Sequence, residues 1–212
     1  MLLPLSGAII AAVKAFSANK RRAAEPHASA RAGTPDAGTT QRTEANQAAQ
    51  WRSLRRVLEE HARTDARWLD YELDVAKLLD FPLMTDMRDP LTMRFHKAKL
   101  RADFLRPAKA EELLDDREAA ARYMSAVEDY VTAFNAAEVE AIRRRRNDFS
   151  RHDQQRIARA QSLLRVASDS AAAPQERQSA YDLARKELDG VVVLPSTTQA
   201  SIERKVSGEL EA

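Results

Sequence analysis

The stretch from Ala108 to Ala173 constrains the fold more than any other part of the chain, because it contains no glycine and no proline. It is rich in alanine, glutamate, arginine and leucine, the residues that lose the least free energy on entering a helix. A single helix of this length would extend about 99 Å at about 1.5 Å per residue, far beyond an ordinary globular helix. The stretch therefore predicts either a helical rod or a helical hairpin.

The composition favours an all-α protein without catalytic function. Only 6% of the 212 residues are aromatic, which favours a core packed from alanine and leucine. Five glycines are too few for an enzyme built from strand-loop-helix units. The absence of cysteine excludes disulfides, thiolate zinc sites and cysteine nucleophiles. The 34 basic and 32 acidic side chains nearly cancel, so the net charge of +2 gives no reason to expect a nucleic-acid partner.

Residues 1–16 form an apolar N-terminal segment that is interrupted by Ser6 and Lys14. The segment is about one turn short of the roughly 18 to 20 residues that span a membrane. Basic residues follow it instead of preceding it, which favours an anchor with the rest of the chain in the cytoplasm over a secretory signal. The alternatives are a short amphipathic or frayed N-terminal helix, a helix that lies at the membrane surface, and a start codon misassigned inside a longer span.

The expected location is therefore the inner membrane with a cytoplasmic C-terminal domain, or the cytoplasm if the segment is not an anchor. The predicted anchor residues are Leu2, Leu3, Leu5, Ile9, Ile10, Val13 and Phe16, and the predicted basic flank is Lys20, Arg21 and Arg22. Residues 17–45 offer almost nothing to fill a core, which predicts a disordered linker.

A helical bundle domain is expected at residues 46–190, followed by an extended segment and a C-terminal helix at 191–212. The first helix of this domain should begin between Glu44 and Gln50, run to about Leu79 and end before Pro82, which disfavours helix in the residue preceding it. Apolar side chains recur along it at steps of three and four in two adjacent stripes, which predicts a helix with two neighbours. The first stripe is Leu54, Leu58, Ala62, Ala66, Leu69, Leu73 and Ala76, and the second is Val57, His61, Trp68, Tyr71, Val75 and Leu78.

The loop after Pro82 is unusually apolar for an exposed connection. It either folds under the bundle or presents Met84 and Met87 to a partner. Asp89 and Pro90 then start a helix that extends to Arg106, and we expect Leu100 and Phe104 to widen its apolar face.

The remaining face of this helix is strongly basic. It could meet anionic lipid or an acidic partner, and a plain solvated face is the alternative. The candidate surface residues on this helix are Arg94, Lys97, Lys99 and Arg101.

The first part of the long run carries a heptad-like seam that Glu138 interrupts. The seam residues are Leu113, Ala120, Met124, Val127, Val131, Phe134 and Ala141, with Leu114, Tyr123, Tyr130 and Ile142 beside them. A stripe this wide favours a coiled-coil-like helix in an elongated bundle of its own chain over a free-standing dimer.

Acidic residues lie near the start of this helix, and Arg143, Arg144, Arg145 and Arg146 lie near its end, which is the order that the helix dipole favours. We therefore expect a break at residues 147–150. A nucleic-acid or lipid contact is the alternative role of the four arginines.

After the break, a helix with Ile157, Ala160, Leu164 and Ala167 on one face turns into a second helix that Pro174 opens and Gly190 ends. Leu163, Leu164, Val166, Ala167, Asp169, Ala172, Glu176, Ala180 and Ala184 resemble in spacing a small bacterial and phage helical hairpin of unknown function. Arg177 stands where that pattern has alanine. The resemblance implies a helical hairpin and no activity.

No residue constellation for catalysis, cofactor binding or metal binding is evident. Zinc-binding, phosphate-binding and nucleophile-elbow motifs are absent. Two pairs four residues apart, His61 with Asp65 and Asp148 with His152, could share a ligand on a helix, but such pairs arise by chance in a chain this charged. We therefore expect no enzyme, no cofactor and no metal.

The leading interpretation is a non-enzymatic, membrane-tethered, cytoplasm-facing helical scaffold or adaptor with protein partners. Its layout resembles the membrane-anchored lipid-uptake coordinator proteins of mycolic-acid bacteria, which implies transporter subunits as partners. The alternatives are a soluble helical bundle that binds nucleic acid or another acidic ligand through its basic faces, and a structural homo-oligomer.

Overall fold

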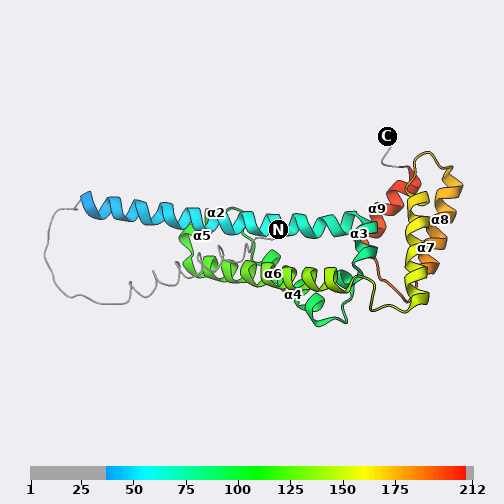
Figure 1. Cartoon of the computed structure of the whole chain (residues 1–212). Helices are drawn as coiled ribbons and strands as arrows, with labels where there is room; N and C mark the ends of the chain where they lie inside the picture. Colours follow the sequence, from blue (N-terminus) through cyan, green and yellow to red (C-terminus); the bar gives the residue numbers. More distant parts are fainter. Residues whose placement is uncertain (1–36, 209–212) are drawn as a thin grey trace. The chain divides into compact units, whose positions relative to one another are not determined.

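Helices account for most of residues 37–208, the part of the chain that this computed structural model describes (Figure 1). The expected all-α fold is confirmed, and no strand occurs within these residues. The elements in chain order are α2 (Ala37–Leu73), α3 (Val75–Asp80), the 3-10 helix η1 (Pro82–Thr85), α4 (Pro90–Phe104), α5 (Glu112–Asp115), α6 (Arg117–Arg144), α7 (Arg151–Ala167), α8 (Pro174–Leu188) and α9 (Ser196–Ser207). The predicted anchor and its basic flank lie outside the described residues.

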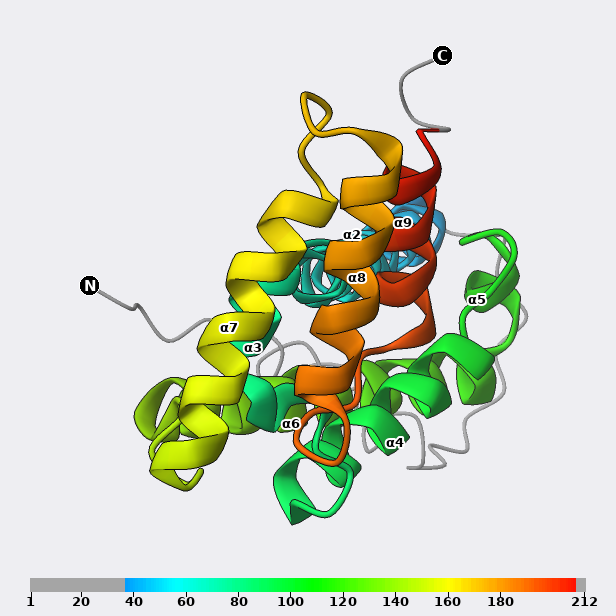
Figure 2. The same cartoon turned by 90° about the vertical axis from the view of Figure 1, so that its right-hand side faces the viewer.

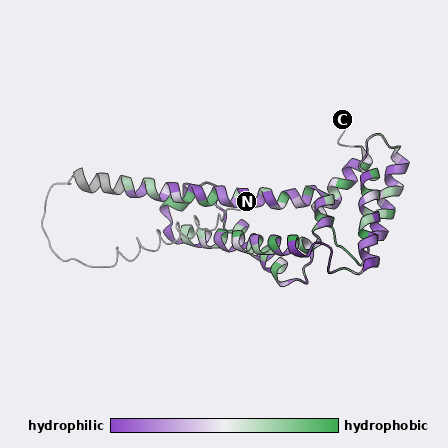
Figure 3. Cartoon of the chain, viewed as in Figure 1, coloured by the Kyte–Doolittle hydropathy of each residue, from purple (hydrophilic) through white to green (hydrophobic). Residues whose placement is uncertain are grey.

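Polar and apolar residues alternate along the helices, as Figure 3 shows. This is the pattern of helices that bury one face and leave the other in water. Within residues 37–208, no helix combines the length and the apolar composition that crossing a bilayer requires.

The described residues divide into two compact units. Unit 1 comprises residues 37–64 and 96–133, and unit 2 comprises residues 65–95 and 134–208. The helices α2, α4 and α6 each contribute residues to both units.

Helix α2 differs from the expected first helix at both ends. It begins at Ala37, ahead of the expected start between Glu44 and Gln50, so the prediction of a disordered linker is wrong for residues 37–45, and it ends at Leu73. Asp74 separates it from α3, because the Asp74 carboxylate accepts the backbone N–H groups of the second and third residues beyond it at 3.0 and 3.1 Å. Aspartate in this role stabilises the start of a new helix more than the continuation of the old one.

The buried face of α2 follows alternating steps of three and four residues, which is the spacing of a heptad seam. Its members are Leu54, Val57, His61, Thr64, Trp68 and Tyr71. The first predicted stripe is wrong beyond Leu58, because Ala62, Ala66, Leu69, Leu73 and Ala76 are exposed. The second predicted stripe is confirmed, because all of its members except Val75 are buried. Thr64 also occupies a seam position although it is polar, and a search for apolar residues alone does not find it.

His61 forms the polar centre of unit 1. Its imidazole is fully buried, with Nδ1 2.9 Å from the Tyr123 hydroxyl and Nε2 3.1 Å from Asp103 Oδ1. The ring also lies edge-on to Tyr130, with 5.6 Å between the ring centroids. Although partial burial opposes it, the hydrogen bond and charge of Lys99 lower the pKa of Asp103. A buried imidazole with both nitrogens bonded costs far less than an unpaired one.

Glu138 is the polar residue that interrupts the apolar seam of α6. In unit 2 its carboxylate accepts hydrogen bonds from two side chains of α2. Arg67 Nη2 donates to the Glu138 carboxylate, and the Tyr71 hydroxyl donates to it at 3.2 Å. Arg67 Nη1 also donates to Asn135 Oδ1 at 2.9 Å, and its guanidinium lies 4.7 Å from the centre of the Phe134 ring. Burial, followed by the charge of Glu138, raises the pKa of Tyr71.

The glycine- and proline-free run contains three helices. Asp116 caps α6, because its carboxylate accepts the N–H groups of Glu118 and Ala119 at 2.9 Å each. The predicted break at residues 147–150 is confirmed, and Ser150 caps α7 by accepting the Asp153 N–H at 3.1 Å. All seven residues of the predicted seam are buried, and so are Tyr123 and Tyr130 beside it. Leu114 is half-buried, and Ile142, the other residue predicted beside the seam, is exposed.

Helices α7, α8 and α9 lie side by side in unit 2 (Figure 2). The α7–α8 hairpin matches the expectation, with α8 starting at Pro174 and Gly190 following it in the left-handed region at φ +70°. The facing side chains are Ile157, Ala160, Leu164 and Ala167 from α7 and Ala180, Tyr181, Ala184 and Leu188 from α8, all of them buried. The Tyr181 hydroxyl donates to Glu203 of α9 at 3.0 Å.

Arg145 provides a test of the break between α6 and α7. It has φ +49°, a left-handed conformation that costs a residue with a side chain about 1 to 2 kcal/mol. We expect Arg145→Gly to raise the free energy of unfolding by up to about 1 kcal/mol, since the greater freedom of glycine in the unfolded chain offsets part of the relief. Arg143→Gly, inside α6, should lower it by about 1 kcal/mol. Urea unfolding of both variants measures this, and equal destabilisation by the two would contradict the account.

Candidate functional site

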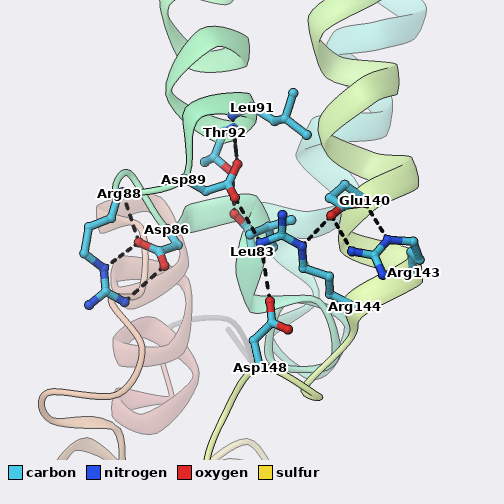
Figure 4. A network of polar contacts seen from close by, with 10 residues as sticks. All are labelled: Leu83, Asp86, Arg88, Asp89, Leu91, Thr92, Glu140, Arg143, Arg144 and Asp148. Atoms are coloured by element: carbon cyan, nitrogen blue, oxygen red, sulfur yellow. Dashed lines mark hydrogen bonds and ion pairs between the residues drawn. The ribbon is translucent and has the colours of Figure 1, made fainter.

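The arginines at the end of α6 bond to other parts of unit 2 (Figure 4). Arg143 and Arg144 both donate to the Glu140 carboxylate. Arg144 Nη1 also lies 3.2 Å from Asp89 Oδ2 and 3.3 Å from Asp148 Oδ2. Asp89 is the residue that caps α4, since its Oδ1 accepts the backbone N–H two residues further on at 2.8 Å. Arg144 therefore ties the end of α6 to the start of α4.

Arg146 joins the loop after α6 to both α3 and α7. Its Nε donates to the Leu79 carbonyl at 3.0 Å, and its Nη2 donates to Asp80 and, at 2.6 Å, to Gln161 Oε1. Gln161 in turn donates to the Ala76 carbonyl at 3.1 Å. Carbonyls in the last turn of a helix lack partners within that helix, so the contact of Arg146 with Leu79 satisfies a group that otherwise needs water.

Three of the four arginines predicted as a partner surface thus bond to residues of unit 2. Arg145 is exposed and has no ion pair within the described chain. Their place at a helix C-terminus is confirmed. Asp80, Asp89 and Gln161 could not be recognised as partners, because each is distant from the arginines in sequence.

Met84 corrects the prediction of a methionine surface on the loop after Pro82. Its side chain is fully buried, and the loop forms η1 and folds under unit 2. The Thr92 hydroxyl holds the loop by donating to the Leu83 carbonyl. Met87 and Arg94 are exposed, as predicted.

The other predicted surface residues lie in unit 1, on the C-terminal half of α4. Lys99 Nζ is 2.8 Å from Asp103 Oδ2, and Arg101 Nη1 is 3.1 Å from Asp129 Oδ2. Lys97 is exposed and has no ion pair among residues 37–208. Lys99 and Arg101 thus form ion pairs within unit 1, whereas Lys97 forms none within the described residues.

The histidines of the two predicted His–Asp pairs have different surroundings, because His61 is buried and His152 is exposed. His61 bonds to Asp103 and Tyr123, so both ring nitrogens that could bind a metal already contact protein groups. Asp148 accepts from Arg144, whereas the ring of His152 lies 3.6 Å from the neighbouring Asp153. The sequence spacing could not show the contact between His61 and Asp103.

An open groove of about 740 Å³ lies between α3, α7 and α9 in unit 2. Its volume is within the range of ligand pockets, but only Leu164 among its lining residues is buried. The lining residues are Leu73, Asp74, Val75, Ala76, Asp80, Gln161, Leu164, Arg165, Ser168, Asp169 and Lys205.

The acidic side chains that line the groove have hydrogen-bond partners, whereas its basic side chains have no ion-pair partner among residues 37–208. The carboxylates of Asp74 and Asp169 accept backbone N–H groups at helix ends, and Asp80 accepts from side chains of unit 2. Arg165 and Lys205 are exposed and have no ion pair within the described residues. The groove therefore combines apolar side chains with three carboxylates and with two cations, Arg165 and Lys205, that have no ion pair in the part of the chain that the structure describes.

Comparisons with protein-family models, with curated proteins and with solved structures found no match.

Glu140 predicts a dependence of stability on pH. Hydrogen bonds from Arg143 and Arg144 lower its pKa from 4.5 to about 2. A carboxylate with a lower pKa in the folded chain stabilises the fold above its unfolded pKa and loses that effect as the pH falls through the folded pKa. We expect Glu140→Gln to lower the free energy of unfolding at neutral pH and the two proteins to converge near pH 2 in urea titrations. A difference that stays constant down to that pH would contradict this role of Glu140.

Proposed function

We propose that the protein is a non-catalytic helical adaptor that binds an acidic and apolar polypeptide segment of a partner in the groove between α3, α7 and α9. The groove carries this proposal, because it places Leu73, Val75 and Leu164 beside the cations Arg165 and Lys205. Apolar anchors with a charged rim are the usual anatomy of a protein-binding surface.

The open form of the groove favours a polypeptide over a small molecule. Small-molecule sites bury most of the surface of their ligand. Here Leu73, Arg165 and Lys205 are exposed, so a helix or an extended segment could lie across the groove and contact all three.

The N-terminal segment supports a tether for this adaptor. Residues 1–16 are apolar and Lys20, Arg21 and Arg22 follow them, the order expected when the rest of the chain lies in the cytoplasm. The adaptor would then hold its partner close to the inner membrane. Subunits of a membrane transport complex, including one that carries lipid, are the partner class that this layout suggests.

A photo-crosslinking amino acid in place of Leu73 tests the groove in cells that express the full chain. We expect one discrete cross-linked protein, because a partner bound in the groove contacts this position. The product should disappear when Arg165→Glu and Lys205→Glu are added, because the reversed charges repel an acidic segment. Arg204→Glu is the matched control, as it changes an exposed cation on α9 that does not line the groove.

Two outcomes would contradict the groove as the binding site. One is a cross-linked product that survives the double charge reversal. The other is the same set of products from Leu183, an exposed leucine of α8 outside the groove.

A further inference from the structure

The C-terminal half of α4 exposes two large apolar side chains of unit 1. Leu100 is 71% exposed and Phe104 is 86% exposed. The expectation that both widen the buried face of this helix is wrong. Ala102 is fully buried and lies two residues from each of them, and two residues turn a helix by about 200°, so Leu100 and Phe104 point away from the core.

Cations share this outward face. Lys97, Leu100 and Phe104 lie within about 60° of one another around the helix, at about 100° per residue, and Arg101 lies at their edge. The ion pair between Arg101 and Asp129 joins two half-exposed side chains, and such pairs hold their partners weakly. From Lys97 to Arg106, the four lysines and arginines exceed the single acidic residue by 4 − 1 = 3 charges.

We propose that the face formed by Lys97, Leu100, Arg101 and Phe104 docks on the surface of an anionic lipid bilayer. The leucine and phenylalanine would enter the boundary between headgroups and acyl chains. The long stems of the lysine and arginine would lie along that apolar layer while their charges stay among the anionic headgroups.

The prominence of Phe104 favours a bilayer over an acidic protein. A protein partner needs a pocket of matching shape to bury a protruding ring, whereas a bilayer deforms around it. A contact of this size is weak and reversible on its own, and two membrane signals together give stable attachment. The inference therefore deepens the proposed function, because the N-terminal tether would keep this face close to lipid.

The chain has no cysteine, so Leu100→Cys gives a single site for an environment-sensitive fluorophore. The labelled full chain is mixed with phosphatidylcholine vesicles, with and without phosphatidylserine. We expect a blue shift and brighter emission with phosphatidylserine only, and a loss of both when salt is added or Phe104→Ser is introduced. Val193→Cys, at a position that is 78% exposed between α8 and α9, is the matched control and should show no shift.

Flotation of the same samples with the vesicles measures whether the protein binds lipid at all, and it distinguishes the docking face of α4 from the N-terminal tether. Flotation with phosphatidylcholine alone, together with a silent label at position 100, overturns the docking face and leaves the tether standing. A label that responds to phosphatidylserine without flotation on phosphatidylcholine supports the face and contradicts the tether. A shift caused by polyglutamate but not by either vesicle overturns the lipid proposal in favour of an acidic protein.

Discussion

The hydrogen bonds of Arg146 hold unit 2 together at the point where α3, the loop after α6 and α7 meet. Asp80 and Gln161, which accept these bonds, also line the groove. The shape of the candidate binding site therefore depends on an arginine that does not line it. Arg144 likewise joins two helices of unit 2, because it bonds from the end of α6 to Asp89 at the start of α4. Charged hydrogen bonds that satisfy helix ends position helices more specifically than apolar packing alone.

Polar side chains within otherwise apolar seams are the second constraint. In unit 1 the buried His61 has partners for both ring nitrogens, and in unit 2 Glu138 receives bonds from Arg67 and Tyr71. A seam of alanine and leucine alone would tolerate a shift of one helix along another. A shift would leave these polar groups without partners, at a cost of about 1 to 3 kcal/mol each. The seams are therefore held in register by a few residues that hydropathy counts as unfavourable.

Much of this fold could be predicted, because helix ends have local causes. Pro174, Ser150 and the arginines after Ala141 mark ends that depend on neighbouring residues only. The second predicted stripe of α2, which includes His61, is the buried face, whereas the first stripe is wrong beyond Leu58 and Thr64 is missed because hydropathy does not mark a threonine as a core residue. The prediction that Leu100 and Phe104 belong to the core rests on their being apolar, although the helical period places both of them opposite the buried face that contains Phe95 and Ala102. The groove was not foreseen either, because its walls come from α3, α7 and α9, which are far apart in sequence.

The arginine run at the end of α6 stabilises unit 2 through the bonds of Arg144 and Arg146. Comparing the free energies of unfolding of Arg146→Gln and Arg145→Gln in urea tests it most directly, because the two changes remove the same charge from adjacent positions. We expect Arg146→Gln to lower the free energy of unfolding by about 1 to 3 kcal/mol, since it removes bonds to the Leu79 carbonyl and to Gln161. Arg145→Gln should change it by less than about 0.5 kcal/mol. Equal effects of the two substitutions would contradict the claim.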